Sequence, residues 1–164
     1  MRNKKVLFLT QAAVIAALYV VLTLIANALG LANQAIQVRF SEALTILPYF
    51  TPAAIPGLFL GCVISNTLTG CLFLDIVFGS IATLIGAVVT YILRKYKWLA
   101  PVAPIVANTI IVPFVLVYVY QVGPLSSWPY FALTVGIGEV ISCGVLGMML
   151  LFALEKRRSQ IFME

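Results

Sequence analysis

The sequence predicts an all-α, polytopic membrane protein built as a bundle of six transmembrane helices. Of its 164 residues, 63% are hydrophobic and only 9% are charged, whereas soluble domains carry about 25% charged residues. A soluble protein of this length could not bury so much apolar surface, but a lipid bilayer removes that requirement. We therefore interpret residues 1–164 as a single transmembrane domain.

Six apolar segments run along the chain, separated by breaks that contain proline, glycine or basic residues. The predicted helices cover about residues 6–29, 36–50, 52–69, 71–93, 101–120 and 130–154. The first apolar run is about 20 residues long, which is too long for the core of a signal peptide, so we interpret it as the first membrane helix. The second segment is the least hydrophobic, because it carries Arg39, Ser41, Glu42 and Thr45.

The basic residues predict how the chain crosses the membrane. Nine of the ten lie in three clusters at the ends of hydrophobic segments. These clusters are Arg2, Lys4 and Lys5; Arg94, Lys95 and Lys97; and Lys156, Arg157 and Arg158. Such clusters are typical of cytoplasmic loops, and six crossings put all three on one side. We therefore expect both termini in the cytoplasm, and we expect no binding of nucleic acid because no basic face is formed.

Several polar residues remain inside the predicted spans, where burying a charge costs roughly 2.5–3.5 kcal/mol. Arg39 and Glu42 are three residues apart and share a helix face, so they form either an internal ion pair or the wall of an outward-facing cavity. Asp75 lies near the start of its segment, either as an acid stabilised by the helix dipole or as a ligand contact. Asn66 and Asn108 either bind a ligand or only lock helices together.

Glu139 is the strongest indication of a binding site. It lies about 14 Å along the helix axis from Tyr130, at 1.5 Å per residue, and so near the middle of the membrane. No basic residue is close to it in sequence. Gly136 and Gly138 would let another helix or a ligand approach closely. We favour a ligand contact over a protonated carboxyl that bonds to a neighbouring helix.

Small residues form a stripe on the first segment. Ala12, Ala13, Ala16 and Ala17 give two overlapping repeats of small residues spaced by four. This spacing permits close helix packing, either inside the chain or against another subunit.

The composition argues against a metal centre and against catalysis. The chain has no histidine and only three cysteines, and these show no CxxC spacing, so we expect no metal site. There is no HExxH motif and no serine with a plausible base, so we expect no catalytic residues. Without a GxxxxGK[ST] loop, the chain has no nucleotide-binding motif of its own. The protein is therefore expected to bind or move a solute, with no cofactor in this chain.

Three segments resemble the QueT family of transport proteins. The longest runs from Val38 to Gly61, and the others are Asp75–Ser80 and Gly136–Glu139. Members of this family are regarded as S components, the membrane-embedded substrate-binding subunits of energy-coupling factor (ECF) transporters for queuosine precursors. The resemblance implies the six-helix S-component fold with both termini inside, in a bacterial cytoplasmic membrane.

The resemblance also implies partners and a substrate. A transmembrane coupling subunit and two cytoplasmic ATPases would use ATP to drive uptake, and the alanine stripe would face the coupling subunit. The substrate would be a 7-deazaguanine base, whose two adjacent N–H donors a carboxylate accepts as a fork. Glu139 or Glu42 would provide that carboxylate, and Asp75 would suit a cationic aminomethyl group. Aromatic candidates for stacking on the base are Tyr49, Phe78 and Tyr130. The alternative function is an autonomous carrier or channel that acts as a small oligomer.

Reporter fusions test the topology. We expect a reporter fused after Glu164 to be active in the cytoplasm, because the basic clusters hold that end inside. A second reporter, which is active only after export, should be active when inserted in the loop at 121–129 and inactive when fused after Glu164. A C-terminal reporter that is active only outside would contradict the six-span model.

Overall fold

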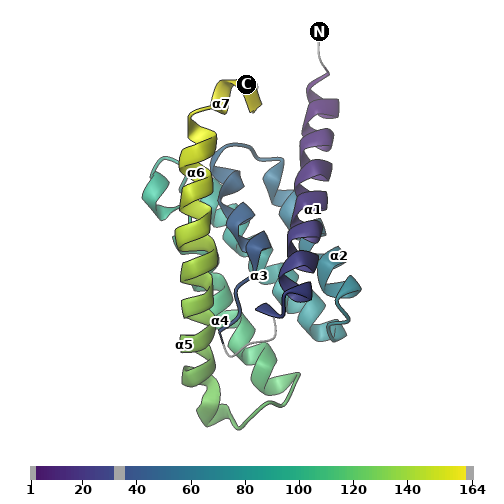
Figure 1. The fold of residues 1–164 in the computed structure, drawn as a ribbon, viewed down its shortest axis with the longest axis vertical. Helices are drawn as coiled ribbons and strands as arrows, with labels where there is room; N and C mark the ends of the chain where they lie inside the picture. The colour runs from purple at the N-terminus through teal and green to yellow at the C-terminus, as the bar shows by residue number, and fades with distance from the viewer. Residues whose placement is uncertain (1–2, 32–35, 162–164) are drawn as a thin grey trace.

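The computed structural model describes residues 3–31 and 36–161, and every regular element in those parts is a helix (Figure 1). Arg2 of the first basic cluster and residues 32–34 of the first break lie outside the described residues. The elements are, in order, α1 Lys4–Ala28, η2 Phe40–Tyr49, α2 Ala54–Leu68, α3 Phe73–Ile92, η3 Lys97–Leu99, α4 Val102–Tyr118, η4 Leu125–Ser127, α5 Trp128–Glu139, η5 Val140–Gly147, α6 Met148–Glu155 and α7 Arg158–Ile161. Of these, η2, η3 and η4 are 3₁₀ helices and η5 is a π-helix.

The described helices confirm the predicted architecture of a helical membrane bundle. Four segments are long and apolar enough to cross a membrane: Lys4–Ala28, Phe73–Ile92, Lys97–Tyr118 and Leu125–Glu155. The two others are shorter, with 15 residues in α2 and 10 in η2. At 1.5 Å per residue, α2 is about 22 Å long, which is less than the roughly 30 Å of a bilayer core. The six predicted segments are therefore all present, and the two short ones follow each other in the chain.

The α-helix predicted at 36–50 was wrong in type and in length. The helix begins only at Phe40, and Arg39 before it is extended. The amide of Glu42 donates to the carbonyl three residues back, and the hydroxyl of Thr45 donates to the Glu42 carbonyl at 2.6 Å. Pro48 has no amide hydrogen to donate. A proline and a side chain that bonds a nearby carbonyl both disfavour regular α-helix, which explains the tighter 3₁₀ geometry.

The other predicted boundaries agree with the structure to within two residues. Such differences are the ordinary uncertainty of helix ends. The segment predicted as one α-helix over 130–154 is continuous, but its middle is the π-helix η5. Periodicity alone did not indicate this widening.

The 3₁₀ helix η2 lies at the centre of the bundle. It contacts α1, α2, α3, η5 and α6, while α1 packs on α2, α2 on α3, α3 on α4 and α4 on α5. In Figure 1 it is the blue helix between α1 and the yellow-green column of α5 and α6. Five of its side chains are at most 2% exposed: Ser41, Glu42, Thr45, Ile46 and Pro48. The least hydrophobic segment of the chain is therefore the most enclosed one.

Both ends of the described chain lie at the same end of the molecule (Figure 1). The ammonium of Lys97 lies 3.2 Å from a carboxylate oxygen of Glu155, so the loop between α3 and α4 is also at that end. This arrangement agrees with an even number of crossings. That this end faces the cytoplasm stays a prediction.

The alanine stripe of α1 is divided between two environments. Ala12 and Ala16 are at most 9% exposed and face α2, whereas Ala13 and Ala17 are exposed. A Cβ atom on Gly61 of α2 would lie 3.1 Å from the Ala16 carbonyl oxygen and 2.8 Å from the Tyr19 Cβ, so the missing side chain lets the two helices meet. The expectation of one continuous docking stripe is therefore corrected for Ala12 and Ala16, which pack inside the chain. A role of Ala13 and Ala17 at a subunit interface stays a prediction.

Tryptophan substitutions separate these two environments. Ala16→Trp should destabilise the protein by about 1–3 kcal/mol, because the ring must displace α2. Ala17→Trp is the matched control one residue away, and its ring would point away from the bundle. Thermal unfolding in detergent should show a lower Tm for the first variant and a Tm near that of the unmodified protein for the second. Equal midpoints would mean that the packing of α1 on α2 is not as described.

Candidate functional site

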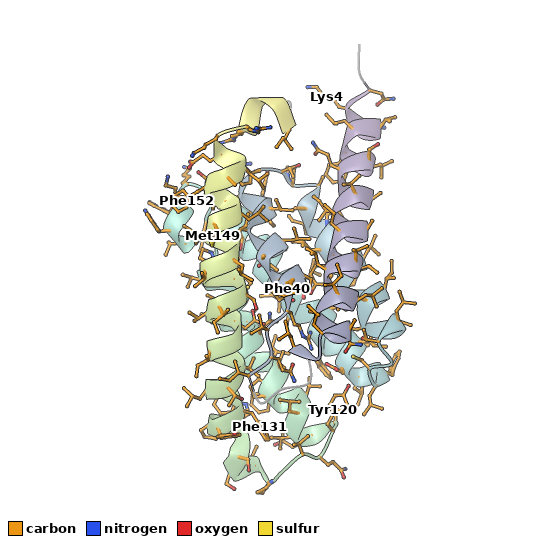
Figure 2. All side chains as sticks on the ribbon, viewed as in Figure 1. Lys4, Phe40, Tyr120, Phe131, Met149 and Phe152 are labelled. Atoms are coloured by element: carbon orange, nitrogen blue, oxygen red, sulfur yellow. The ribbon has the colours of Figure 1, made fainter. Side chains whose placement is uncertain are left out.

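A polar cavity of about 310 Å³ opens between the ends of α1, α2, α3 and α4. Its lining residues are Thr23, Asn27, Gln37, Arg39, Asn66, Thr69, Cys71, Asp75, Val112, Val115, Leu116, Tyr120 and Val122. Figure 2 labels Tyr120 near the lower end of the molecule, far from Lys4 and from both chain ends. The cavity therefore lies in the half of the bundle opposite to the termini.

A narrower space of about 20 Å³ continues this cavity toward the centre of the bundle. The two spaces share Gln37, Arg39, Asp75 and Val112. The inner space is also lined by Glu42, Asn108 and Glu139, which come from η2, α4 and α5. The fold thus brings together residues that are far apart in sequence.

Glu42 is the most enclosed carboxylate of the site, with 2% exposure. The hydroxyl of Tyr19 donates to its Oε1 at 2.5 Å, and the amide of Asn108 donates to its Oε2 at 3.4 Å. Both oxygens therefore have a partner, as a buried carboxylate requires. These bonds tie η2 to α1 and to α4.

Glu139 and Cys143 lie beside Glu42. One ligand atom from each of the three side chains lies within 4.8 Å of the others. The sulfur of Cys143 is 3.1 Å from Oε2 of Glu139 and 3.4 Å from the carbonyl oxygen of Glu42, so its one proton is shared between two acceptors. A metal ion could share such atoms, but the Glu42 oxygens already accept hydrogen bonds. The absence of a metal stays a prediction.

Acidic side chains outnumber basic ones among the described residues along the two spaces. Glu42, Glu139 and Asp75 face a single cation, Arg39, among the described lining residues. The Arg39 amide donates to the hydroxyl of Ser142, and its guanidinium makes no direct ion pair in the described part of the chain. Charges interact more strongly in such a low-dielectric interior than in water. The site therefore favours a ligand that brings N–H donors or a positive charge.

Asp75 and Tyr120 form the outer part of the cavity wall. The hydroxyl of Tyr120 donates to Oδ2 of Asp75 at 2.8 Å and accepts from the amide of Leu72 at 3.2 Å. Partial burial, and then the hydrogen bond to Asp75, raise the pKa of Tyr120, so it stays a donor. Asp75 is both in the first turn of α3 and on the cavity wall, so the two roles considered for it are compatible.

The π-helix η5 holds η2 and the residue before it in position through side-chain hydrogen bonds. Ser142 accepts the amide hydrogen of Arg39 at 3.1 Å, while Cys143 contacts the Glu42 carbonyl and lies 3.4 Å from the Thr45 hydroxyl. Two adjacent residues of η5 therefore reach η2 and the residue that precedes it. π-Helical turns are often found at functional sites. Here the turn follows Glu139 directly and fixes it relative to Arg39 and Glu42.

Gly138 allows the chain to enter η2 beside α5. A Cβ atom at this position would overlap the carbonyl oxygen of Gln37, whereas a Cβ on Gly136 would lie 3.4 Å from the hydroxyl of Thr109. Of the two glycines singled out in the sequence, only Gly138 is therefore indispensable for the close approach. The approach is to a backbone segment of the same chain.

All six polar residues predicted from the sequence line these two spaces: Arg39, Glu42, Asn66, Asp75, Asn108 and Glu139. Glu139 has no basic residue close to it in sequence, but the fold surrounds it with polar residues that are distant in sequence, among them Arg39, Glu42 and Asn108. The aromatic candidates do not line either space; Tyr49 packs on Phe50, and Phe78 and Tyr130 are exposed. Their selection rested on residue type alone.

Three contributors were missed by sequence reasoning: Tyr19, Tyr120 and Cys143. Tyr19 is 1% exposed on an apolar helix, where a buried hydroxyl needs a hydrogen-bond partner. Cys143 follows Glu139 by four residues and so lies on the same face of the helix. Both signals were present in the sequence. Tyr120 could not be found in this way, because its partner depends on how α3 and α4 pack.

Comparison with known proteins gives the family. The sequence model of the QueT transporter family matches residues 9–156, which is most of the chain. The chain belongs to the QueT transporter family. The resemblance found in the sequence is thereby confirmed.

One relative of this QueT family member is the Queuosine precursor transporter QueT of Lactococcus lactis subsp. cremoris (strain MG1363). It is 33% identical over 85 residues, which cover 52% of this chain and 50% of the relative. The chain thus matches about half the length of that relative. No solved structure matches the chain.

Alanine substitutions test how Gly138 shapes the site. Gly138→Ala should lower stability by about 1–3 kcal/mol, because the methyl group forces Gln37 and the entrance to η2 away from α5. Gly136→Ala, the control two residues away, should change stability by less than about 0.5 kcal/mol. The measurement is the Tm of each purified variant in detergent. A Gly138→Ala protein as stable as the control would refute the close approach.

Proposed function

We propose that this chain is the substrate-binding S component of an ATP-driven ECF uptake transporter, and that its substrate is a queuosine precursor with a 7-deazaguanine base. The observation that carries the proposal is the polar cavity that leads to the close pair of carboxylates, Glu42 and Glu139. Family membership and the name of the Lactococcus lactis relative support it.

The hydrogen-bonding groups of the base suit the carboxylates at the inner end of the cavity, where the space of about 20 Å³ would have to widen to admit the edge of the ring. A 7-deazaguanine ring carries two adjacent N–H donors, which a carboxylate accepts as a fork. Both oxygens of Glu42 already accept hydrogen bonds, from Tyr19 and Asn108. Glu139 accepts through Oε2 from a thiol, which is a weak donor. We therefore propose that Glu139 accepts the two N–H groups of the ring and that Glu42 has a supporting role.

Charge would orient the ligand along the cavity. A precursor with an aminomethyl group is cationic, and Asp75 lies on the wall of both spaces. With the ring edge at Glu139, the cationic group would point toward the mouth and Asp75. Arg39 and Asn108 offer donors to the carbonyl oxygen of the ring, and Asn66 lies on the outer wall.

The direction of the cavity suits uptake. It lies in the half opposite to the chain termini, which in the predicted topology is the half facing outside. The chain carries no nucleotide-binding motif, so the energy would come from two ATPase subunits through a coupling subunit. Ala13 and Ala17 are available on the exposed face of α1 for that subunit. An autonomous carrier would instead transport in vesicles without ATPases, whereas an S component would not.

Glu139→Gln tests the ligand assignment. The substitution keeps the shape of the side chain but replaces an acceptor oxygen with a donor that would face a ligand N–H. We expect the Kd for a 7-deazaguanine precursor to rise at least about tenfold, equivalent to about 1.4 kcal/mol. Isothermal titration calorimetry on the purified protein measures this change.

Glu155→Gln is the matched control, because Glu155 pairs with Lys97 at the end of the molecule opposite to the cavity. Its Kd should equal that of the unmodified protein. Equal affinities for the Glu139 variant and the control would mean that Glu42 or Asp75, and not Glu139, accepts the N–H groups of the ring. If the unmodified protein binds no 7-deazaguanine precursor, the proposed substrate is wrong.

A further inference from the structure

An apolar groove of about 410 Å³ runs along the outside of the bundle between α3 and α4. The described residues that line it are all aliphatic: Ile85, Val89, Leu93, Val102, Ala103, Val106, Ala107, Ile110 and Ile111. On α3 and on α4 the rim residues recur every four positions, and Ala103 and Ala107 form a floor of small side chains. From Leu93 to Ile85 the groove is about 12 Å long at 1.5 Å per residue.

One end of this groove opens at the loop that joins α3 to α4. Leu93 and Val102 line the groove and flank that loop, which carries Arg94 and Lys95 as exposed residues. The loop also exposes Tyr96 and Trp98, by 63% and 67%. Exposed tyrosine and tryptophan beside basic residues are typical of the boundary between hydrocarbon and head groups.

Two positive charges at this end have no acidic partner within the described residues. The ammonium group of Lys97 already has partners, because it pairs with Glu155 at 3.2 Å and lies over the ring of Phe152. Arg94 lies 4.4 Å from the centre of the Tyr91 ring, a contact that leaves its N–H donors available. Lys95 makes no ion pair in the described part of the chain. The groove is therefore apolar along its length and has two positively charged residues at one end.

We propose that this groove is a binding site for one anionic phospholipid of the phosphatidylglycerol type. Arg94 and Lys95 bind its phosphate, and one acyl chain lies in the groove between α3 and α4. The length of the groove matches a single leaflet, which is about 15 Å, half of a 30 Å hydrocarbon core. Basic residues next to the end of a membrane helix attract anionic head groups at this depth.

A lipid fits this surface better than a protein partner does. The described lining offers no side-chain donor or acceptor, and a groove of aliphatic ridges suits a flexible hydrocarbon chain. The positive charges are confined to one end, as the single phosphate of a lipid requires. The site is separate from the polar cavity and does not depend on which solute that cavity binds.

Native mass spectrometry with defined lipids tests the site. The purified protein is titrated with dioleoyl phosphatidylglycerol or with dioleoyl phosphatidylcholine, which have the same acyl chains. We expect the first lipid to bind at least about tenfold more tightly, and the R94Q/K95Q variant to lose this preference. The control is K4Q/K5Q, which removes two charges from α1 at the same end of the molecule. It should keep the preference.

Substitutions that fill the groove test whether the acyl chain binds there. Ala103→Phe narrows the floor, and Val106→Trp narrows the rim at a residue that is already 49% exposed and so tolerates a larger ring. Both should weaken phosphatidylglycerol binding at least about fivefold with unchanged circular dichroism. Unchanged binding in both variants, or equal losses in R94Q/K95Q and K4Q/K5Q, would overturn the proposal. A lack of lipid preference in the unmodified protein, together with loss of coupling-subunit binding in R94Q/K95Q, would also overturn it and would assign the groove to a protein partner.

Discussion

The burial of Glu42 at the centre of the bundle is the constraint on which the site depends. A carboxylate with 2% exposure needs partners for both oxygens. Tyr19 and Asn108 supply them from α1 and α4, and the carbonyl of the same residue contacts Cys143 on η5. Because each partner comes from a different element, the hydrogen bonds that satisfy this carboxylate also fix the relative positions of those elements.

The same constraint explains why the least regular segment is the most enclosed. An α-helix in the place of η2 would turn its side chains in different directions, because it has 3.6 rather than 3.0 residues per turn. The 3₁₀ helix instead directs Glu42 toward the inner space, while the extended Arg39 before it faces the cavity. The outer helices are long and apolar, so they provide the membrane anchoring that this segment lacks. Function and anchoring are thus assigned to different parts of the chain.

The sequence was sufficient to predict most of the fold and the polar lining of the site. Apolar segments and basic clusters are strong signals in a membrane protein, since every backbone group in lipid must be satisfied within a helix. A charged residue in such a segment is costly, which is why Arg39, Glu42 and Glu139 could be singled out. The geometry of η2 and the π-helix could not be predicted, because they arise from contacts between distant segments. The division of the alanine stripe depends in the same way on Gly57 and Gly61 of α2.

The π-helix has a consequence for how the chain can vary. Ser142 and Cys143, which contact Arg39 and Glu42, both lie in the stretch where the helix is locally wider than an α-helix. A π-turn holds one residue more than an α-helical turn, so loss of one residue between Glu139 and Gly147 would restore a regular α-helix and change how Ser142 and Cys143 face residues 39–42. The number of residues in this stretch is therefore more constrained than their identity.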